Sequence, residues 1–205
     1  MKTMNRVNVL CLIGLTLLLT GCVKLWKENI DIKTYMIEAE RDGEPVSKVL
    51  APKLWIDAVN VLPPSNVRNL IIRESDVEYT TSYYTELLMS PSENFRNELF
   101  VWLSACGLFD EVSIVDRSGR SHSLVTTVME FHGDKPGEAA VLRLKATLLD
   151  EMTRGNRVVF SKDYAQRVTL TQTSAESLIR AYNSALTSIL EELEADIANA
   201  LSPAP

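Results

Sequence analysis

The segment between Ala140 and Leu148 has an apolar side chain at every second position. The small and aliphatic residues that share one face of this segment are Ala140, Leu142, Leu144, Ala146 and Leu148. The polar residues that share the other face are Arg143, Lys145 and Thr147. Because successive side chains of a strand point to opposite faces of a sheet, one face must be covered and the other must be wet. The pattern predicts an antiparallel strand in a sheet that is buried on one side.

Other apolar runs predict further strands. A turn at residues 154–156 leads into a partner strand that contains Val158, Phe160, Tyr164, Val168 and Leu170. The upstream segments with strand character are residues 35–37, 53–62, 69–73, 77–80, 112–115 and 124–131. The long run 53–62 stops at Pro63-Pro64, and 69–73 and 77–80 are expected to be the arms of a short hairpin.

A first helix is predicted after Ser90-Pro91-Ser92-Glu93. Ser90 is expected at the N-cap and Glu93 three residues later, which is the spacing of a capping box. One apolar face then recurs at three-to-four spacing through Phe95, Leu99, Trp102 or Leu103, and Cys106. Gly107 is expected to end the helix in a left-handed conformation.

A second, longer helix is predicted from Thr173-Ser174-Ala175-Glu176, which we interpret as another capping box, to about Leu201. Its apolar stripe consists of Leu178, Tyr182, Ala185, Ile189, Leu193 and Ile197. Glu176 and Arg180 are spaced for an ion pair one turn apart. Its acidic residues off the stripe, for which a solvated surface is favoured over a metal or partner patch, are Glu191, Glu192, Glu194 and Asp196.

Together these elements predict the α+β class, with a mostly antiparallel sheet and two main helices, the second long and C-terminal. We expect a single periplasmic α+β domain over residues 35–201 and a loose tail over residues 202–205. No internal repeat or low-complexity linker divides this part of the chain.

The first 22 residues have the order of a bacterial lipoprotein signal. Lys2 and Arg6 precede an apolar run of about 13 residues, and Leu19-Thr20-Gly21-Cys22 has the form of a lipobox. A lone transmembrane anchor is the alternative, but a spanning helix needs roughly 20 apolar residues. We therefore expect a signal peptide over residues 1–21, cleavage before Cys22, lipid attachment to Cys22 (palmitate among the acyl chains), and a lipidated tether over residues 22–34.

Charge and cysteine content restrict the function classes. The chain has a formal net charge of -6 and no basic stripe, which argues against nucleic-acid binding. Of the three cysteines, Cys11 would leave with the signal and Cys22 would carry lipid. Cys106 then remains alone, so we expect no disulfide and a buried, unreactive thiol.

The sequence lacks the common catalytic and metal-binding patterns. A Ser121, His122 and Asp116 set could be assembled on paper as a hydrolase site, and His132 is the other candidate base. No nucleophile elbow, paired metal-ligand spacing or glycine-rich phosphate loop accompanies them. We expect a protein that is not an enzyme and holds no metal and no cofactor; a secreted hydrolase using His122 is the alternative.

Several aromatic side chains could line a lipid groove, although most are expected in the core. They are Trp55, Tyr79, Tyr83, Tyr84, Trp102, Phe131 and Tyr164. The segment Tyr83–Met89 carries one charge in seven residues and precedes the first helix, which suits a protein-protein contact. We predict partner binding by Tyr83, Tyr84, Leu87 and Leu88.

The order of these elements resembles the ABC-type transport auxiliary lipoproteins. The segments that carry the resemblance after the lipobox are Tyr35-Met36-Ile37, residues 59–63, residues 69–73, the helix ending near Leu108-Phe109, Leu124–Phe131 and the C-terminal helix. The family often has a tryptophan and a Pro-Leu step before the first helix; here Tyr84 and Leu87-Leu88 precede Ser90-Pro91.

This resemblance implies a subunit of an MCE-type ABC transport system that moves phospholipid or similar hydrophobic molecules across the cell envelope. The implied partners are an MCE-domain protein and its ABC transporter complex, with the lipoprotein forming a homo-oligomeric ring at the outer membrane. Val23 after the lipidated cysteine favours the outer membrane, whereas Lys24 leaves the inner membrane open. An envelope assembly lipoprotein for an outer-membrane protein or lipopolysaccharide pathway is the alternative.

Overall fold

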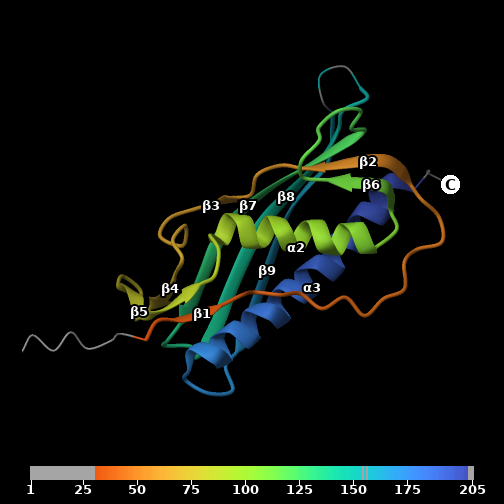
Figure 1. The fold of residues 1–205 in the computed structure, drawn as a ribbon. Coiled ribbons are helices and arrows are strands. Elements are labelled where there is room, and N and C mark those ends of the chain that lie inside the picture. The colour runs from red at the N-terminus through yellow and green to blue at the C-terminus, as the bar shows by residue number, and fades with distance from the viewer. Residues whose placement is uncertain (1–30, 154, 156, 203–205) are drawn as a thin grey trace, which may run out of the picture. The chain divides into compact units, whose positions relative to one another are not determined.

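The centre of the fold is β7 (His122–Asp134), a strand of 13 residues. The structure is a computed structural model that describes residues 31–153, 155 and 157–202. Along one side of β7 runs β8 (Ala139–Asp150), and β9 (Arg157–Thr169) pairs with β8; both ladders are antiparallel. Figure 1 shows these three strands crossing the molecule behind the helices.

Three short strands lie one after another along the other side of β7, all parallel to it. They are β2 (Ala51–Ile56), β3 (Asn60–Val61) and β4 (Asn69–Arg73). Two branches extend the sheet from there. At one end β6 (Phe109–Ser113) pairs with β2, and at the other β5 (Tyr79–Leu87) and then β1 (Lys33–Tyr35) follow β4. The α+β class is confirmed, and the sheet is mixed, with long antiparallel ladders and short parallel pairings.

Some expected strand boundaries are wrong. The single strand expected over 53–62 is divided into β2 and β3, because Ile56 lies opposite Leu124 and Asn60 opposite Thr127. Between these two pairs the chain moves four residues along while β7 moves three. The extra residue reverses which side chains point to each face of the sheet. The first strand covers Lys33–Tyr35 rather than 35–37, so it begins inside the segment 22–34 that we expected to be a tether.

Both helices lie across the same face of the sheet, as Figure 1 shows. The first, α2 (Pro91–Ala105), has the expected capping box: Ser90 Oγ accepts from Glu93 N at 3.3 Å, and Glu93 Oε2 accepts from Ser90 N at 3.2 Å. Gly107 follows with a φ of 78°. A Cβ at Gly107 would lie 2.9 Å from the carbonyl oxygen of Val46, so glycine is required both by conformation and by space.

The second helix, α3 (Ala175–Leu201), has a different cap from the expected one. Ser174 is the N-cap, and its Oγ accepts from Ser177 N at 3.1 Å. The third helical residue is therefore Ser177, so the predicted capping box with Glu176 is wrong. Glu176 instead accepts from Arg180 at 2.9 Å, the expected pair one turn away.

The core lies between the sheet and the helices. All five predicted inner residues of β8 and all six predicted stripe residues of α3 are buried in one cluster. Phe131 of β7 joins the layers, with its ring 4.5 Å from that of Tyr182 and 5.3 Å from that of Phe95. Cys106 is buried in the same cluster, and burial raises the pKa of its thiol.

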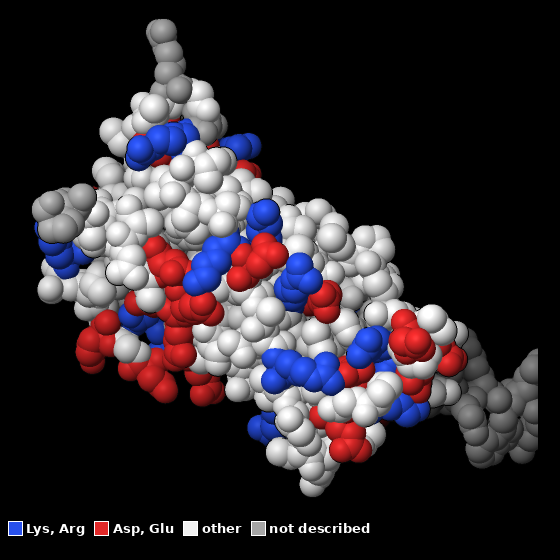
Figure 2. Space-filling model, turned by 180° about the vertical axis from the view of Figure 1, so that it is seen from behind, with Lys and Arg blue, Asp and Glu red and all other residues white. Residues whose placement is uncertain are grey.

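The opposite face of the sheet is wet, as the alternation in β8 predicts. Arg143 projects there and pairs with Glu130 of β7 at 3.1 Å and with Asp163 of β9 at 3.4 Å. Figure 2 shows this face of the molecule, on which basic and acidic side chains are interspersed over a largely uncharged surface.

A strap of extended chain (residues 36–50) joins β1 to β2; in Figure 1 it runs below α2 and passes over α3. Four consecutive main-chain N–H groups of this strap donate to side chains taken alternately from α2 and α3. The acceptors for Ile37, Glu38, Ala39 and Glu40 are, in that order, Asn94, Asn183, Glu98 and Thr187. On each helix the two acceptors are four residues apart and therefore lie on the same face. One extended segment can thus place its N–H groups against acceptors of both helices.

None of the helices in the described part of the chain is long and apolar enough to cross a membrane.

Candidate functional site

An irregularity in β5 builds the most distinctive surface of the molecule. Ile71 of β4 lies opposite Thr81, and Asn69 lies opposite Glu86. The four residues 82–85 of β5 therefore oppose the single residue Leu70, which forces β5 to bulge away from β4. Asn69 holds the bulge in place, because its Nδ2 donates to the carbonyl oxygen of Ser82 at 2.9 Å. We call residues 82–85 the β5 bulge.

The outer side of the bulge is aromatic and exposed. Tyr83 is 81% exposed and Tyr84 is 61% exposed, and Leu88, just after the strand, is 53% exposed. Leu87 differs from these three because it is 0% exposed and belongs to the core. The prediction that Leu87 binds a partner is therefore wrong: the strand alternation returns at Leu87 and turns its side chain inward.

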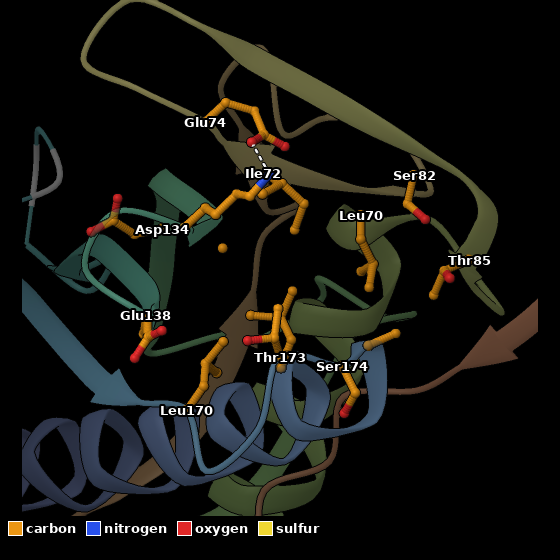
Figure 3. Close-up of a pocket in the computed structure, with 14 residues that line it drawn as sticks. Leu70, Ile72, Glu74, Ser82, Thr85, Asp134, Glu138, Leu170, Thr173 and Ser174 are labelled. Carbon is orange, nitrogen blue, oxygen red and sulfur yellow. Dashed lines mark hydrogen bonds and ion pairs between the residues drawn. The ribbon is translucent and has the colours of Figure 1, made fainter.

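The inner side of the bulge forms one wall of a pocket of about 520 Å³. Ser82 and Thr85 line that wall, and Leu70 and Ile72 of β4 point from the sheet toward Thr173 and Ser174 at the start of α3, as Figure 3 shows. The remaining lining residues are Glu74, Gly133, Asp134, Lys135, Glu138, Leu170, Ala175 and Leu178. The pocket thus has an aliphatic floor and a rim of hydroxyl and charged groups.

The floor depends on a glycine in β7. A Cβ at Gly133 would lie 2.8 Å from Cδ1 of Ile72 and 3.1 Å from Cδ2 of Leu178. These contacts are closer than normal packing distances, so any larger residue would push β4 and α3 apart or fill the space between them. Gly133 therefore permits the close approach of α3 and β4 below the pocket.

Charges at the rim are paired. Lys135 reaches across to Glu74, as the dashed line in Figure 3 shows, and this bond lowers the pKa of Glu74. Asp134 is buried and binds both Arg73, at 2.8 Å, and Arg167. Burial raises the pKa of Asp134, but the hydrogen bonds from Arg167 and Arg73 outweigh it and lower that pKa overall.

Thr85 has an unusual position in this wall. The residue is only 8% exposed, but its hydroxyl is not among the buried polar atoms of the described residues that lack a partner. Because Thr85 lines the pocket, it offers a polar group to whatever enters.

The structure does not assemble the hydrolase set considered from sequence. Ser121 Oγ lies 3.0 Å from Nδ1 of His122, but it also donates to the carbonyl oxygen of Lys53 at 2.8 Å. Asp116 binds Nζ of Lys53 at 3.1 Å. Burial lowers the pKa of His122. Ser121 and Asp116 thus both secure β2, and neither is arranged as part of a catalytic triad.

Most of the aromatic residues that could line a lipid groove are buried, as expected. Those buried in the core or in polar contacts are Trp55, Trp102, Phe131 and Tyr164. Tyr79 is partly exposed and packs edge-on against His132, with 5.6 Å between the ring centres.

Of the four acidic residues for which a solvated surface was expected, Glu191 is exposed, whereas Glu192, Glu194 and Asp196 have structural partners. Glu194 binds Arg41 of the strap at 2.8 Å and Trp102 Nε1 at 2.7 Å. Glu192 and Asp196 both bind Lys162 at 2.7 Å. Within the part of the chain that the structure describes, no group of His, Cys, Asp and Glu is arranged to hold a metal ion.

Cys22, the predicted lipidation site, lies outside the described residues. The pocket was not predicted from the sequence, because its walls come from β4, β5, β7 and α3, which are distant in sequence. The only local signal was the polar and aromatic run from Tyr79 to Thr85, in which strict alternation fails.

Comparison with known proteins gives one family. The model of the ABC-type transport auxiliary lipoprotein component matches residues 35–194. No curated protein matches the chain.

Solved structures share the fold at low sequence identity. A protein of Xanthomonas campestris has a TM-score of 0.67 at 17% identity, and the match covers 78% of this chain and 92% of that one. An uncharacterized protein also has a TM-score of 0.67, at 16% identity, over 81% of this chain and 98% of its own. A hypothetical protein of Chlamydia trachomatis has a TM-score of 0.53 at 7% identity, over 73% and 99% of the two chains.

Proposed function

Because the chain belongs to the ABC-type transport auxiliary lipoprotein component family, we propose that it is the lipid-anchored subunit of an MCE-type ABC transport system. In this proposal the system moves phospholipid or similar hydrophobic molecules across the cell envelope, and this subunit docks its partner at the outer membrane. The observation that carries the proposal is the family match, which spans all the strands and helices from β2 to β9, α2 and most of α3. The family is one of transport auxiliaries and not of enzymes.

The proposed anchor is a lipid on Cys22. The lipobox at residues 19–22 supports cleavage and acylation at this cysteine. One acyl chain binds a membrane only reversibly, so several chains on one cysteine make a lasting anchor. Val23 supports delivery to the outer membrane, and fractionation of the full chain between the two membranes tests this part of the proposal.

The proposed docking surface is the exposed side of the β5 bulge, made by Tyr83 and Tyr84, together with Leu88. Exposed tyrosines suit protein interfaces, because they bury a large apolar area and keep a hydroxyl for hydrogen bonding at small entropic cost. Leu87 supports this surface from the core below. A ring of identical subunits would present several copies of the surface to an MCE-domain protein.

Site-specific photo-crosslinking in cells tests the docking surface. Benzoylphenylalanine replaces Tyr83 in the full chain, and the adducts formed under ultraviolet light are identified by mass spectrometry. We expect an MCE-domain protein or its ABC transporter. The matched control carries the same residue at Val115, which follows β6 at the opposite end of the sheet and is also exposed.

Three results would be informative. An adduct between two copies of this chain from Tyr83 would assign the surface to the ring instead. A β-barrel partner would favour the envelope assembly role and overturn the transport role. Equal adducts from Tyr83 and Val115 would remove the assignment of docking to the β5 bulge.

A further inference from the structure

The pocket beneath the β5 bulge has the lining of a site for an amphiphile, and we propose that it binds a hydrocarbon chain of a membrane lipid. This inference rests on the proposed transport function for the role of the lipid, but the site itself follows from the lining and the reach of the anchor described below. It gives the domain a second site, distinct from the outward-facing tyrosines.

The floor of the pocket matches a flexible aliphatic chain. Leu70, Ile72, Leu170 and Leu178 supply branched aliphatic surface, and Gly133 lets Ile72 and Leu178 pack closely in the floor. None of the described residues that line the pocket is aromatic. Its volume of about 520 Å³ lies within the usual range for small-ligand pockets. Each methylene that leaves water for such a surface strengthens binding.

The wall above the floor offers polar groups to the ester of an acyl chain. Thr85, which carries a hydroxyl, lines this wall. Ala175, the first residue of α3, lines the opposite side, and amides of a first helical turn have no acceptor within the helix. An ester carbonyl could accept from these groups, which gives the lipid a fixed orientation.

The mouth suits an uncharged or zwitterionic head. Glu74 and Lys135 neutralise each other across the rim, and Asp134 is held by Arg73 and Arg167. Glu138, also at the rim, adds a negative charge that disfavours a strongly anionic head. Phosphatidylethanolamine, which has both charges in its head group, fits this arrangement.

The length of the tether places a lipid surface within reach. Lys33 lies eleven residues after Cys22, and a fully extended chain spans at most about 3.6 Å per residue, or about 40 Å. Lys33 lies directly opposite Thr85 in the pairing of β1 with β5. A lipid on Cys22 would therefore hold this wall of the pocket within about 40 Å of the bilayer.

Photolabelling of the full-length lipoprotein tests the proposal. The purified protein is mixed with vesicles of phosphatidylethanolamine and phosphatidylglycerol that contain phosphatidylethanolamine with a diazirine in one acyl chain. After irradiation the labelled peptides are mapped. We expect label in residues 70–85 and 170–178, and a lipid adduct whose mass distinguishes it from the chain's own anchor.

Two variants fill the pocket from its rim, Ala175→Phe and Ser82→Phe. Each should reduce pocket labelling by about tenfold, because exclusion of about two methylene groups costs that much affinity. Ala165→Phe makes the same change on the exposed face of β9, outside the pocket, and should leave labelling unchanged. Thermal unfolding of all three variants checks that the fold is intact.

Label confined to Tyr83, Tyr84 and Leu88, and equal in all variants, would show contact with the membrane surface only and would overturn the proposal. Label absent from the pocket of the folded wild-type protein would also overturn it. Pocket labelling without an MCE adduct from Tyr83 would instead retain the lipid site and reject the proposed partner, so the two failures are distinguishable.

Discussion

The main-chain N–H of Ala39 donates to Oε2 of Glu98 at 2.9 Å, across 59 residues of sequence. Asn94, one turn earlier in α2, forms a reciprocal pair with Ile37: Oδ1 accepts at 3.0 Å and Nδ2 donates at 2.7 Å. These are buried polar contacts between the strap and a helix, and their loss would leave backbone groups without partners.

Glu98→Ala should lower the free energy of unfolding by about 2 kcal/mol, because a hydrogen bond to a charged acceptor is lost from a buried place. Glu98→Gln retains an acceptor oxygen and should lose less than half as much. Urea denaturation of the three proteins measures the difference. Equal losses from Ala and Gln would show that the bond to Ala39 does not contribute.

Gly107→Ala should cost more than Gly119→Ala, although both glycines have left-handed backbones, with φ of 78° and 65°. A Cβ at Gly119 meets nothing within 4 Å, whereas at Gly107 it meets the Val46 carbonyl oxygen at 2.9 Å. We expect the free energy of unfolding to fall by about 1 kcal/mol in Gly119→Ala, because of backbone conformation alone. In Gly107→Ala it should fall by about 2–4 kcal/mol, since crowding adds about 1–3 kcal/mol. Denaturant midpoints of the two variants give the comparison.

Tyr83→Ala and Leu87→Ala should have opposite effects on stability and docking. Substitution of the exposed Tyr83 should change the free energy of unfolding by less than about 0.5 kcal/mol. Substitution of the buried Leu87 should lower it by about 2–5 kcal/mol. Only Tyr83→Ala should weaken envelope integrity at wild-type protein level, as measured by detergent sensitivity of cells. A destabilised Tyr83→Ala protein would contradict the exposed position of that side chain.

Protonation of Asp116 in acid should make the protein less stable. Hydrogen bonds from Ser118 and the ammonium of Lys53 lower the pKa of Asp116 from 3.8 to about 2. Because the folded pKa lies below the unfolded value, this stabilisation is complete above pH 3.8 and is lost as the pH falls toward about 2. The stability difference between wild type and Asp116→Asn, followed by denaturation against pH, should shrink over that window and stay constant above it.

Cys106 should be unreactive in the folded protein. It is buried, and burial raises the pKa of its thiol, so little thiolate is available for reaction. In the mature lipoprotein a thiol reagent should modify no cysteine before unfolding and one cysteine in denaturant. A second reactive thiol would show that Cys22 is free, and would contradict lipidation.

Sequence patterns were sufficient where the relevant contacts are local or regular. The alternation through Leu142 and Leu144 identified the long antiparallel ladder, and Ser90 with Glu93 identified the start of α2, because cap and period depend on neighbouring residues. The C-terminal stripe of α3 was confirmed for the same reason.

The short parallel pairings could not be predicted in this way. The position of Asn60 opposite Thr127 depends on one extra residue between β2 and β3, and no local pattern indicates which residue is extra. The β5 bulge could not be predicted for the same reason, since Leu70 opposes four residues only after β4 has paired with β7. The pocket and its Thr85 wall then follow from contacts between distant segments, which explains why Leu87 was placed on the wrong side.

The alternating acceptors of the strap impose an order of assembly. Ile37 and Ala39 need α2, while Glu38 and Glu40 need α3, so the four bonds can form together only after the two helices lie side by side. The strap precedes both helices in the sequence, yet it is consequently among the last segments to settle, because contacts between distant segments require the intervening chain to be ordered.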